Sequence, residues 1–159
     1  MRYRNQKRAA AYAISIIIAL AVGGISALLS LKGMEQYASL RQPPLSPPGW
    51  LFPVAWTILY TLMGISAARV YLADTAETRP ALWIYAFQLL VNALWSPIFF
   101  SLQLRLAAFV WLLILIALVI VTIVRFKRVD IPAGNLQFPY LIWLLFAAYL
   151  DLATYILNG

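Results

Sequence analysis

The residues in this chain that could do chemistry are aromatic and amide side chains inside long apolar segments. The chain has no Cys and no His, which removes thiol nucleophiles, the commonest general base and the usual zinc and haem ligands. Asp151 is the only acid inside an apolar segment, so the paired carboxylates of acid–base catalysis are absent. Any chemistry must therefore come from a bound ligand or from tryptophan itself, and no metal or other cofactor is required.

These aromatic and amide residues recur at helical spacing in three segments. Residues three and four apart share one face of an α-helix, and three such faces that converge would line one internal pocket. The three stripes are Pro53, Trp56, Tyr60, Met63 and Ala67; Tyr85, Gln88, Asn92 and Trp95; and Tyr140, Trp143, Ala147, Asp151 and Tyr155. Plainer alternatives stay open: aromatic packing or interfacial anchoring, interhelical hydrogen bonds from Gln88 and Asn92, and a hydrated or Arg-paired carboxylate at Asp151.

The sequence predicts that these stripes lie on membrane-spanning helices. The chain of 159 residues is 64% hydrophobic with a mean hydropathy of +0.86, which is too apolar for a soluble globular protein. Apolar spans at residues 9–31, 50–68, 81–104, 106–124 and 137–157 each hold roughly 19–24 residues, enough to cross the hydrocarbon core. The sequence predicts an all-α membrane protein, a single domain built as a bundle of five transmembrane helices. The alternative for the first span, a secretory signal, is disfavoured by its length.

The basic residues indicate an orientation in the membrane. The net charge of +7 comes from residues beside apolar spans, where they set topology and meet anionic lipid rather than nucleic acid. If the N-terminus is inside, nine basic residues lie on the inner side and three on the outer side, which predicts a cytoplasmic N-terminus and an outer C-terminus. The inner residues are Arg2, Arg4, Lys7, Arg8, Arg69, Arg79, Arg125, Lys127 and Arg128, and the outer ones are Lys32, Arg41 and Arg105.

A proline-rich stretch joins the first two spans. Residues 42–60 read QPPLSPPGWLFPVAWTILY, and paired prolines cannot sit inside a helix, because they lack an N–H and force the preceding residue toward extended geometry. Pro53 falls in the first turn of the following helix, where the missing N–H costs little. The connection 32–49 is the longest loop, and we expect it to form a stiff lid over a pocket at the outer end.

Three segments resemble the TspO/translocator protein family, whose members are also called tryptophan-rich sensory proteins or peripheral benzodiazepine receptors. They are YASLRQPPLSPPGWLFPVAWTILYTLMG at 37–64, QLLVNALWSPIFF at 88–100 and FPYLIWLLFAAYLD at 138–151. The resemblance implies a five-helix bundle, often a homodimer. It also implies a pocket toward the first loop that binds porphyrins, sterols and isoquinoline-type or benzodiazepine-type drugs. Tyr37, Trp56, Asn92, Trp95, Trp143 and Ala147 fall where the family lines that pocket.

The chain departs from the family pattern at three places. Leu45 stands where the proline-rich loop of the family commonly has Trp, which predicts a weaker grip on a flat ring. Asp151 stands where Asn is common in the fifth helix, which adds an acid to the expected pocket. Tyr155 is followed only by ILNG, without the basic residue that ends the cholesterol motif of the animal members, a weak pattern in any case.

The leading hypothesis is a membrane receptor-like protein that binds a tetrapyrrole such as protoporphyrin IX, with a sensory or regulatory role in a tetrapyrrole or stress response. Its ring would stack on Trp56 and Trp143, and Lys32 and Arg41 could pair with the propionates. The expected ligand-binding residues are Tyr37, Trp56, Tyr60, Gln88, Asn92, Trp95, Tyr140, Trp143, Ala147 and Asp151.

Three other functions remain open. One is a light-dependent porphyrin-degrading enzyme, because Trp56 and Trp143 match the tryptophans implicated in that breakdown in bacterial relatives and would be the catalytic residues. The others are a tetrapyrrole or lipid transporter, and a structural partner without a ligand of its own. Expected partners are the tetrapyrrole, membrane lipid and a second copy of the chain in a homodimer.

Overall fold

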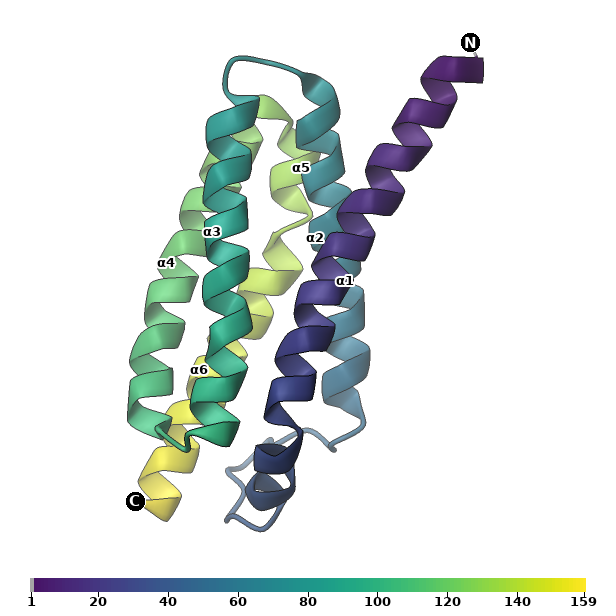
Figure 1. The fold of residues 1–159 in the computed structure, drawn as a ribbon. Coiled ribbons are helices and arrows are strands. Elements are labelled where there is room, and N and C mark those ends of the chain that lie inside the picture. Colours follow the sequence, from purple (N-terminus) through teal and green to yellow (C-terminus); the bar gives the residue numbers. More distant parts are fainter. Residues whose placement is uncertain (1) are drawn as a thin grey trace.

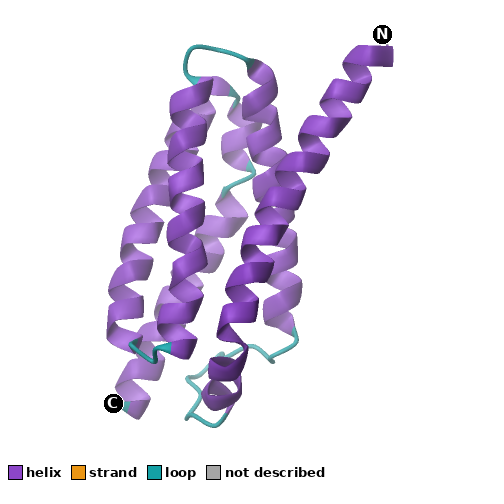
Figure 2. Ribbon diagram, in the orientation of Figure 1, coloured by secondary structure: helices purple, strands orange, loops and turns teal. Residues whose placement is uncertain are grey.

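The computed structural model describes residues 2–159, with side chains from residue 5 onward. The side chains of Arg2 and Arg4, which were counted toward the orientation, therefore lie outside the described part. The elements in order are α1 (Arg2–Ala38), α2 (Leu51–Ala73), α3 (Thr78–Ser96), the π-helical segment η1 (Pro97–Ser101), α4 (Arg105–Val129), α5 (Ile131–Asn135) and α6 (Phe138–Asn158). Residues 2–159 contain no strand (Figure 2).

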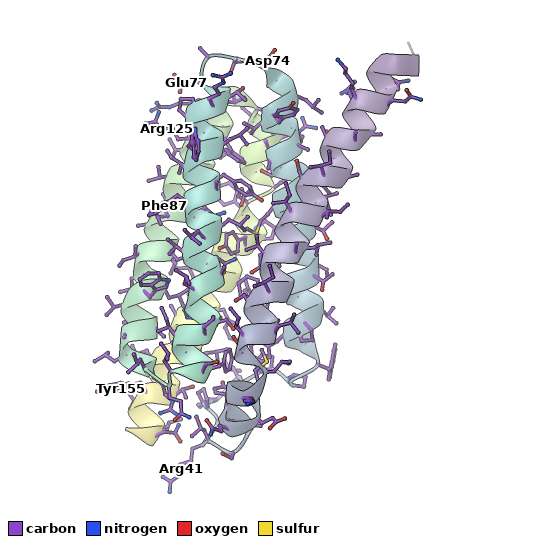
Figure 3. All side chains as sticks on the ribbon, viewed as in Figure 1. Arg41, Asp74, Glu77, Phe87, Arg125 and Tyr155 are labelled. Carbon is purple, nitrogen blue, oxygen red and sulfur yellow. The ribbon has the colours of Figure 1, made fainter. Side chains whose placement is uncertain are left out.

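Five helical segments are long and apolar enough to cross a membrane, which confirms the predicted fold class. They span Asn5–Ala38, Leu51–Ala73, Thr78–Ser101, Arg105–Val129 and Ile131–Asn158. Charged side chains lie at the two ends of the bundle. Figure 3 shows Glu77 and Arg125 at one end and Arg41 at the other. Phe87 lies midway and is 56% exposed, as expected of an apolar side chain that faces lipid.

The boundaries differ from the expected ones at the first loop. Helix α1 continues to Ala38, so the first seven residues of the expected loop 32–49 are helical and the connection is residues 39–50. Lys, Met, Glu and Gln in this stretch are good helix formers, and the first proline arrives only at Pro43. Lys32 and Tyr37 consequently lie on the last turns of α1 rather than in a loop.

The third span also differs from a continuous helix. Helix α3 ends at Ser96, and Pro97 begins the π-helical segment η1. A proline cannot donate the hydrogen bond that an α-helix needs at that position, and it clashes with the preceding turn. The resulting π-helical turn changes the direction in which Phe99 and Phe100 project.

The spans run up and down, so the two ends of the bundle carry different segments (Figure 1). We call the end with residues 39–50 and the C-terminus the outer end, and the end with the N-terminus and α5 the inner end. Helix α1 packs along α2 and against η1, α4 packs against both α3 and α6, and α2 and α6 meet at few points along their backbones. That sparse backbone contact leaves room for large side chains between α2 and α6.

Polar contacts hold α2 to the chain segment before α6 at the inner end. The Ser66 hydroxyl donates to the Ala133 carbonyl oxygen at 2.7 Å and accepts from Gln137 Nε2 at 3.0 Å. Arg69 Nη2 pairs with Asp130 Oδ2 at 2.9 Å, and Asp130 Oδ1 also accepts from the Ala133 backbone N–H at 3.1 Å. Buried polar groups need such partners because lipid offers none.

Two glycines let α1 approach its neighbours closely. A Cβ added at Gly64 of α2 would lie 2.5 Å from Ile16 Cα, which is closer than side chains can stand to backbone. A Cβ at Gly33 of α1 would overlap the Phe100 carbonyl group of η1. Small residues at such crossings are typical of membrane helix packing, and the second crossing brings Tyr37, one turn further along, to the outer end of the pocket.

Candidate functional site

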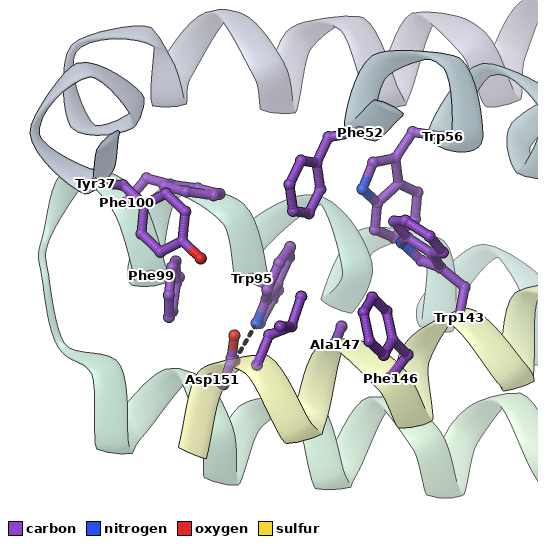
Figure 4. A pocket seen from close by; sticks show the side chains of 11 residues that line it. Tyr37, Phe52, Trp56, Trp95, Phe99, Phe100, Trp143, Phe146, Ala147 and Asp151 are labelled. Atoms are coloured by element: carbon purple, nitrogen blue, oxygen red, sulfur yellow. Dashed lines mark hydrogen bonds between the residues drawn. The ribbon is translucent and has the colours of Figure 1, made fainter. Parts of the chain in front are cut away.

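A pocket walled by aromatic rings lies at the outer end, between α2, α6 and the α3–η1 segment (Figure 4). The lining side chains leave about 370 Å³ of space between them when the open mouth is counted, so the enclosed part of the pocket is small. The lining residues are Tyr37, Phe52, Trp56, Trp95, Phe99, Phe100, Trp143, Phe146, Ala147, Leu150 and Asp151. The pocket therefore combines a nearly continuous aromatic wall with a single carboxyl group.

Helical spacing explains how two of the walls arise. Phe52 and Trp56 lie four residues apart on α2, and Trp143, Ala147 and Asp151 follow at the same spacing on α6, so each set shares one face. The third wall includes the consecutive residues Phe99 and Phe100 of η1. The chain thus contributes to the pocket from all three segments that carry the aromatic and amide stripes.

Trp56 is at the centre of the aromatic cluster. Its ring stacks on Tyr60 with centroids 5.4 Å apart and planes 29° apart, and it meets Trp95 at 6.4 Å. It meets Trp143 edge to face, with centroids 6.4 Å apart and planes 83° apart. Such offset and edge-to-face pairs are favourable. In this conformation a flat ligand can stack on Trp56 or on Trp143. It cannot stack on both at once, because the two ring planes are nearly perpendicular.

Trp95 and Asp151 connect the second and third walls. Trp95 Nε1 donates a hydrogen bond to Asp151 Oδ2 at 2.9 Å (Figure 4), and the Trp95 ring stacks on Phe99 at 5.8 Å. Asp151 is only 2% exposed, which argues against a hydrated surface carboxylate. Neither ion pair among the described residues includes it, and no Lys or Arg lines the pocket. Asp151 is therefore a buried carboxyl group with an indole N–H as its partner.

Four of the expected ligand-binding residues lie beneath the pocket instead of lining it. Asn92 Nδ2 donates to the Tyr60 hydroxyl at 3.0 Å, and the Tyr140 hydroxyl donates to Gln88 Oε1 at 3.2 Å. All four side chains are buried, and both tyrosine rings contact Trp56. They support the floor of the pocket through interhelical hydrogen bonds. The other six expected residues, Tyr37, Trp56, Trp95, Trp143, Ala147 and Asp151, line it.

Five of the lining residues, all apolar, were not expected from the sequence. They are Phe52, Phe99, Phe100, Phe146 and Leu150. A phenylalanine in a membrane helix faces lipid as readily as it faces a neighbouring helix, so its presence gives no directional signal. Their only sequence signal was helical spacing: Phe52 lies four residues before Trp56, and Phe146 lies three after Trp143.

The proline-rich connection is fastened to α6 at the outer end but does not line the pocket. The Arg41 backbone N–H donates to Asn158 Oδ1 at 3.0 Å, and Asn158 Nδ2 donates back to the Arg41 carbonyl oxygen at 3.1 Å. The Tyr149 hydroxyl donates to the Pro44 carbonyl oxygen at 2.7 Å. Leu45 has a left-handed backbone with φ of 66° and is 81% exposed. Its side chain therefore points away from the pocket.

Comparison with known proteins gives one consistent family. The family model described as TspO/MBR matches residues 14–156. The chain is 37% identical to the Tryptophan-rich protein TspO of Chlorobaculum tepidum over 92% of this chain and 94% of that protein. It is 42% identical to Protein CrtK of Rhodobacter capsulatus over 92% of each chain. It is also 37% identical to the Translocator protein of Ovis aries over 76% of this chain and 73% of that one. With its five helices that are long and apolar enough to cross a membrane, the chain belongs to the TspO/MBR family and is an integral multi-pass membrane protein.

Proposed function

We propose that this protein binds a tetrapyrrole, represented by protoporphyrin IX, in the aromatic pocket and acts as a sensor or regulator of tetrapyrrole or stress responses. The observation that carries the proposal is the cluster of Trp56, Trp95 and Trp143, whose rings border one cavity at the outer end. Large flat rings gain most from such faces. A relative from Cereibacter sphaeroides carries the name Tryptophan-rich sensory protein and is 40% identical over 80% of this chain, which supports the sensory reading.

The ring would enter from the outer end and stack on one indole. Because Trp56 and Trp143 stand edge to face, a four-ring ligand needs one of these side chains to rotate. Phe52 lies in the first turn of α2, and its ring contacts Trp143 with the two ring centroids 6.0 Å apart. Movement there would widen the entry while the Asn92–Tyr60 hydrogen bond keeps the floor in place.

The propionates would meet Arg105 rather than Lys32 or Arg41. Arg105 lines a smaller hollow that shares Tyr37, Phe99 and Phe100 with the aromatic pocket. Lys32 and Arg41 are exposed, and neither lines the pocket or the hollow. A guanidinium pairs well with a carboxylate, often through two parallel hydrogen bonds. This arrangement would place the flat ring among the tryptophans and its acidic edge toward the membrane surface.

The test is a titration of purified protein with protoporphyrin IX, followed by quenching of tryptophan fluorescence. Trp56→Phe and Trp143→Phe are each expected to weaken binding roughly 5- to 30-fold, because each loses indole stacking area worth about 1–2 kcal/mol. Trp83→Phe is the matched control, because Trp83 is 76% exposed and outside the pocket. Unchanged affinity in both pocket variants would show that the porphyrin binds elsewhere.

A second candidate function is light-driven oxidation of the bound porphyrin through tryptophan radicals, with dioxygen as the oxidant. The short spacing of Trp56 from both Trp95 and Trp143, 6.4 Å between centroids in each case, favours it. Illumination of the complex in air is expected to yield a new absorbing product, with none in the dark or under argon. Bleaching at the same rate in Trp56→Phe, Trp143→Phe and wild-type protein would remove this candidate.

The expected partners besides the tetrapyrrole are membrane lipid and a second copy of the chain. These, and the orientation with the N-terminus in the cytoplasm, stay predictions.

A further inference from the structure

The pocket contains a buried acid whose charge nothing in the lining balances. Asp151 is 2% exposed and lines the cavity together with ten other residues, none of them basic. Its Oδ2 accepts from Trp95 Nε1 at 2.9 Å, and an indole N–H carries no positive charge. The carboxyl group therefore has a neutral partner and no cation beside it inside an aromatic cavity.

An unpaired carboxylate is costly in such surroundings. Away from water, a carboxyl group either keeps its proton or faces a cation. A single neutral N–H donor, here the indole of Trp95, satisfies one oxygen but does not balance a negative charge. A ligand that brings its own positive charge would stabilise the ionised form, and the carboxyl proton would leave to water as that ligand enters.

The walls around Asp151 also suit a cation. Trp95 donates to the carboxyl group directly, and Tyr37, Phe99 and Phe100 form a further group of rings in mutual edge contact at the same end of the pocket. The faces of Trp, Tyr and Phe rings attract cations, more strongly when water is excluded. An acid set among aromatic rings is thus complementary to an ammonium group attached to an apolar aromatic body.

We propose that this pocket binds aromatic amines in their protonated form, with the ammonium paired to Asp151 and the aromatic body among the tryptophans. The proposal goes beyond tetrapyrrole binding and does not depend on it. The enclosed part of the pocket is small, so a ligand of one or two fused rings requires less displacement of the lining side chains than a four-ring macrocycle does.

The test compares tryptamine, which is cationic at neutral pH, with 3-propylindole, its neutral counterpart of the same shape. Binding of each to the protein in lipid nanodiscs is measured by calorimetry, with empty nanodiscs subtracted to remove partition into lipid. Wild-type protein is expected to prefer tryptamine by at least about tenfold, since a desolvated cation gains from both the carboxylate and the ring faces. Equal affinities in wild-type protein overturn the proposal without any variant.

Asp151→Asn then locates the preference. The amide has the same shape and still offers Trp95 an oxygen acceptor, so the pocket should keep its structure. Tryptamine is expected to bind about tenfold more weakly and 3-propylindole within about twofold of wild type, because only the charge is removed. The 3-propylindole result reports whether the variant is folded.

The matched control is Glu35→Gln, which removes a carboxylate from an exposed position on α1 outside the pocket. Glu35→Gln is expected to change the affinity for neither tryptamine nor 3-propylindole. The effect would be assigned to general surface charge if Glu35→Gln lost the preference for tryptamine, or if Asp151→Asn kept that preference. Failure of protoporphyrin IX to bind, with the tryptamine preference intact, would overturn the tetrapyrrole proposal and leave this one standing.

Discussion

Replacing Ala147 with phenylalanine is expected to eliminate ligand binding in the aromatic pocket while leaving the fold intact. Ala147 is 6% exposed and is the smallest side chain in the lining, on the α6 face between Trp143 and Asp151. A phenyl ring there would fill the space that a ligand ring needs. The affinity for protoporphyrin IX should fall at least about 100-fold, because the overlap costs several kcal/mol. Fluorescence titration measures the loss.

The control for this substitution places the same side chain on the opposite face of α6. Leu145 is 54% exposed and faces away from the pocket, so Leu145→Phe should bind protoporphyrin IX with the affinity of the wild type. Thermal unfolding in detergent shows whether each variant keeps its packing. A folded Ala147→Phe protein that binds normally would mean that the ligand does not occupy this cavity.

Replacing Gly64 with alanine is expected to destabilise the bundle by about 1–3 kcal/mol, because the added methyl group overpacks the crossing of α1 and α2. The methyl group would lie 2.5 Å from Ile16 Cα, 2.8 Å from the Ile16 nitrogen and 2.9 Å from the Ser15 carbonyl oxygen. All three are backbone atoms and cannot yield by changing rotamer, so the two helices must separate. The thermal unfolding temperature in detergent should fall.

Gly24 of α1 provides the matched control with the opposite sign. A Cβ added there meets nothing within 4 Å, and alanine favours a helix over glycine by about 0.8–1 kcal/mol. Gly24→Ala should therefore leave the unfolding temperature unchanged or raise it. If both glycine substitutions behaved alike, close backbone approach at Gly64 would not be what limits the packing of α1 on α2.

Apolar length and helical spacing predicted the fold class and five of the eleven residues that line the pocket. Apolar length is a local property and sets which segments cross the membrane. Helical spacing then set which side chains share a face, and amide or acidic residues marked the inward faces, because polar groups avoid lipid. These signals predicted that Trp56, Trp95, Trp143, Ala147 and Asp151 face a common pocket, and all five line it.

The division between residues that line the pocket and residues that lie beneath it comes from the packing of the helices. Asn92 and Gln88 carry the same inward signal as Asp151, yet their bonds to Tyr60 and Tyr140 place them in the floor. That division depends on how far the helices stand apart, which no single stripe encodes.

Phe99 and Phe100 line the pocket from the π-helical turn that Pro97 begins, whereas Leu45 is 81% exposed and lies outside the lining. An apolar side chain in a membrane helix is stable whether it faces lipid or another helix, so only the packing of the helices determines which apolar residues line the pocket. The same packing brings Trp95 of α3 against Asp151 of α6, two residues 56 positions apart. The chemistry suggested by the aromatic and acidic residues thus depends on a contact that only the assembled bundle forms.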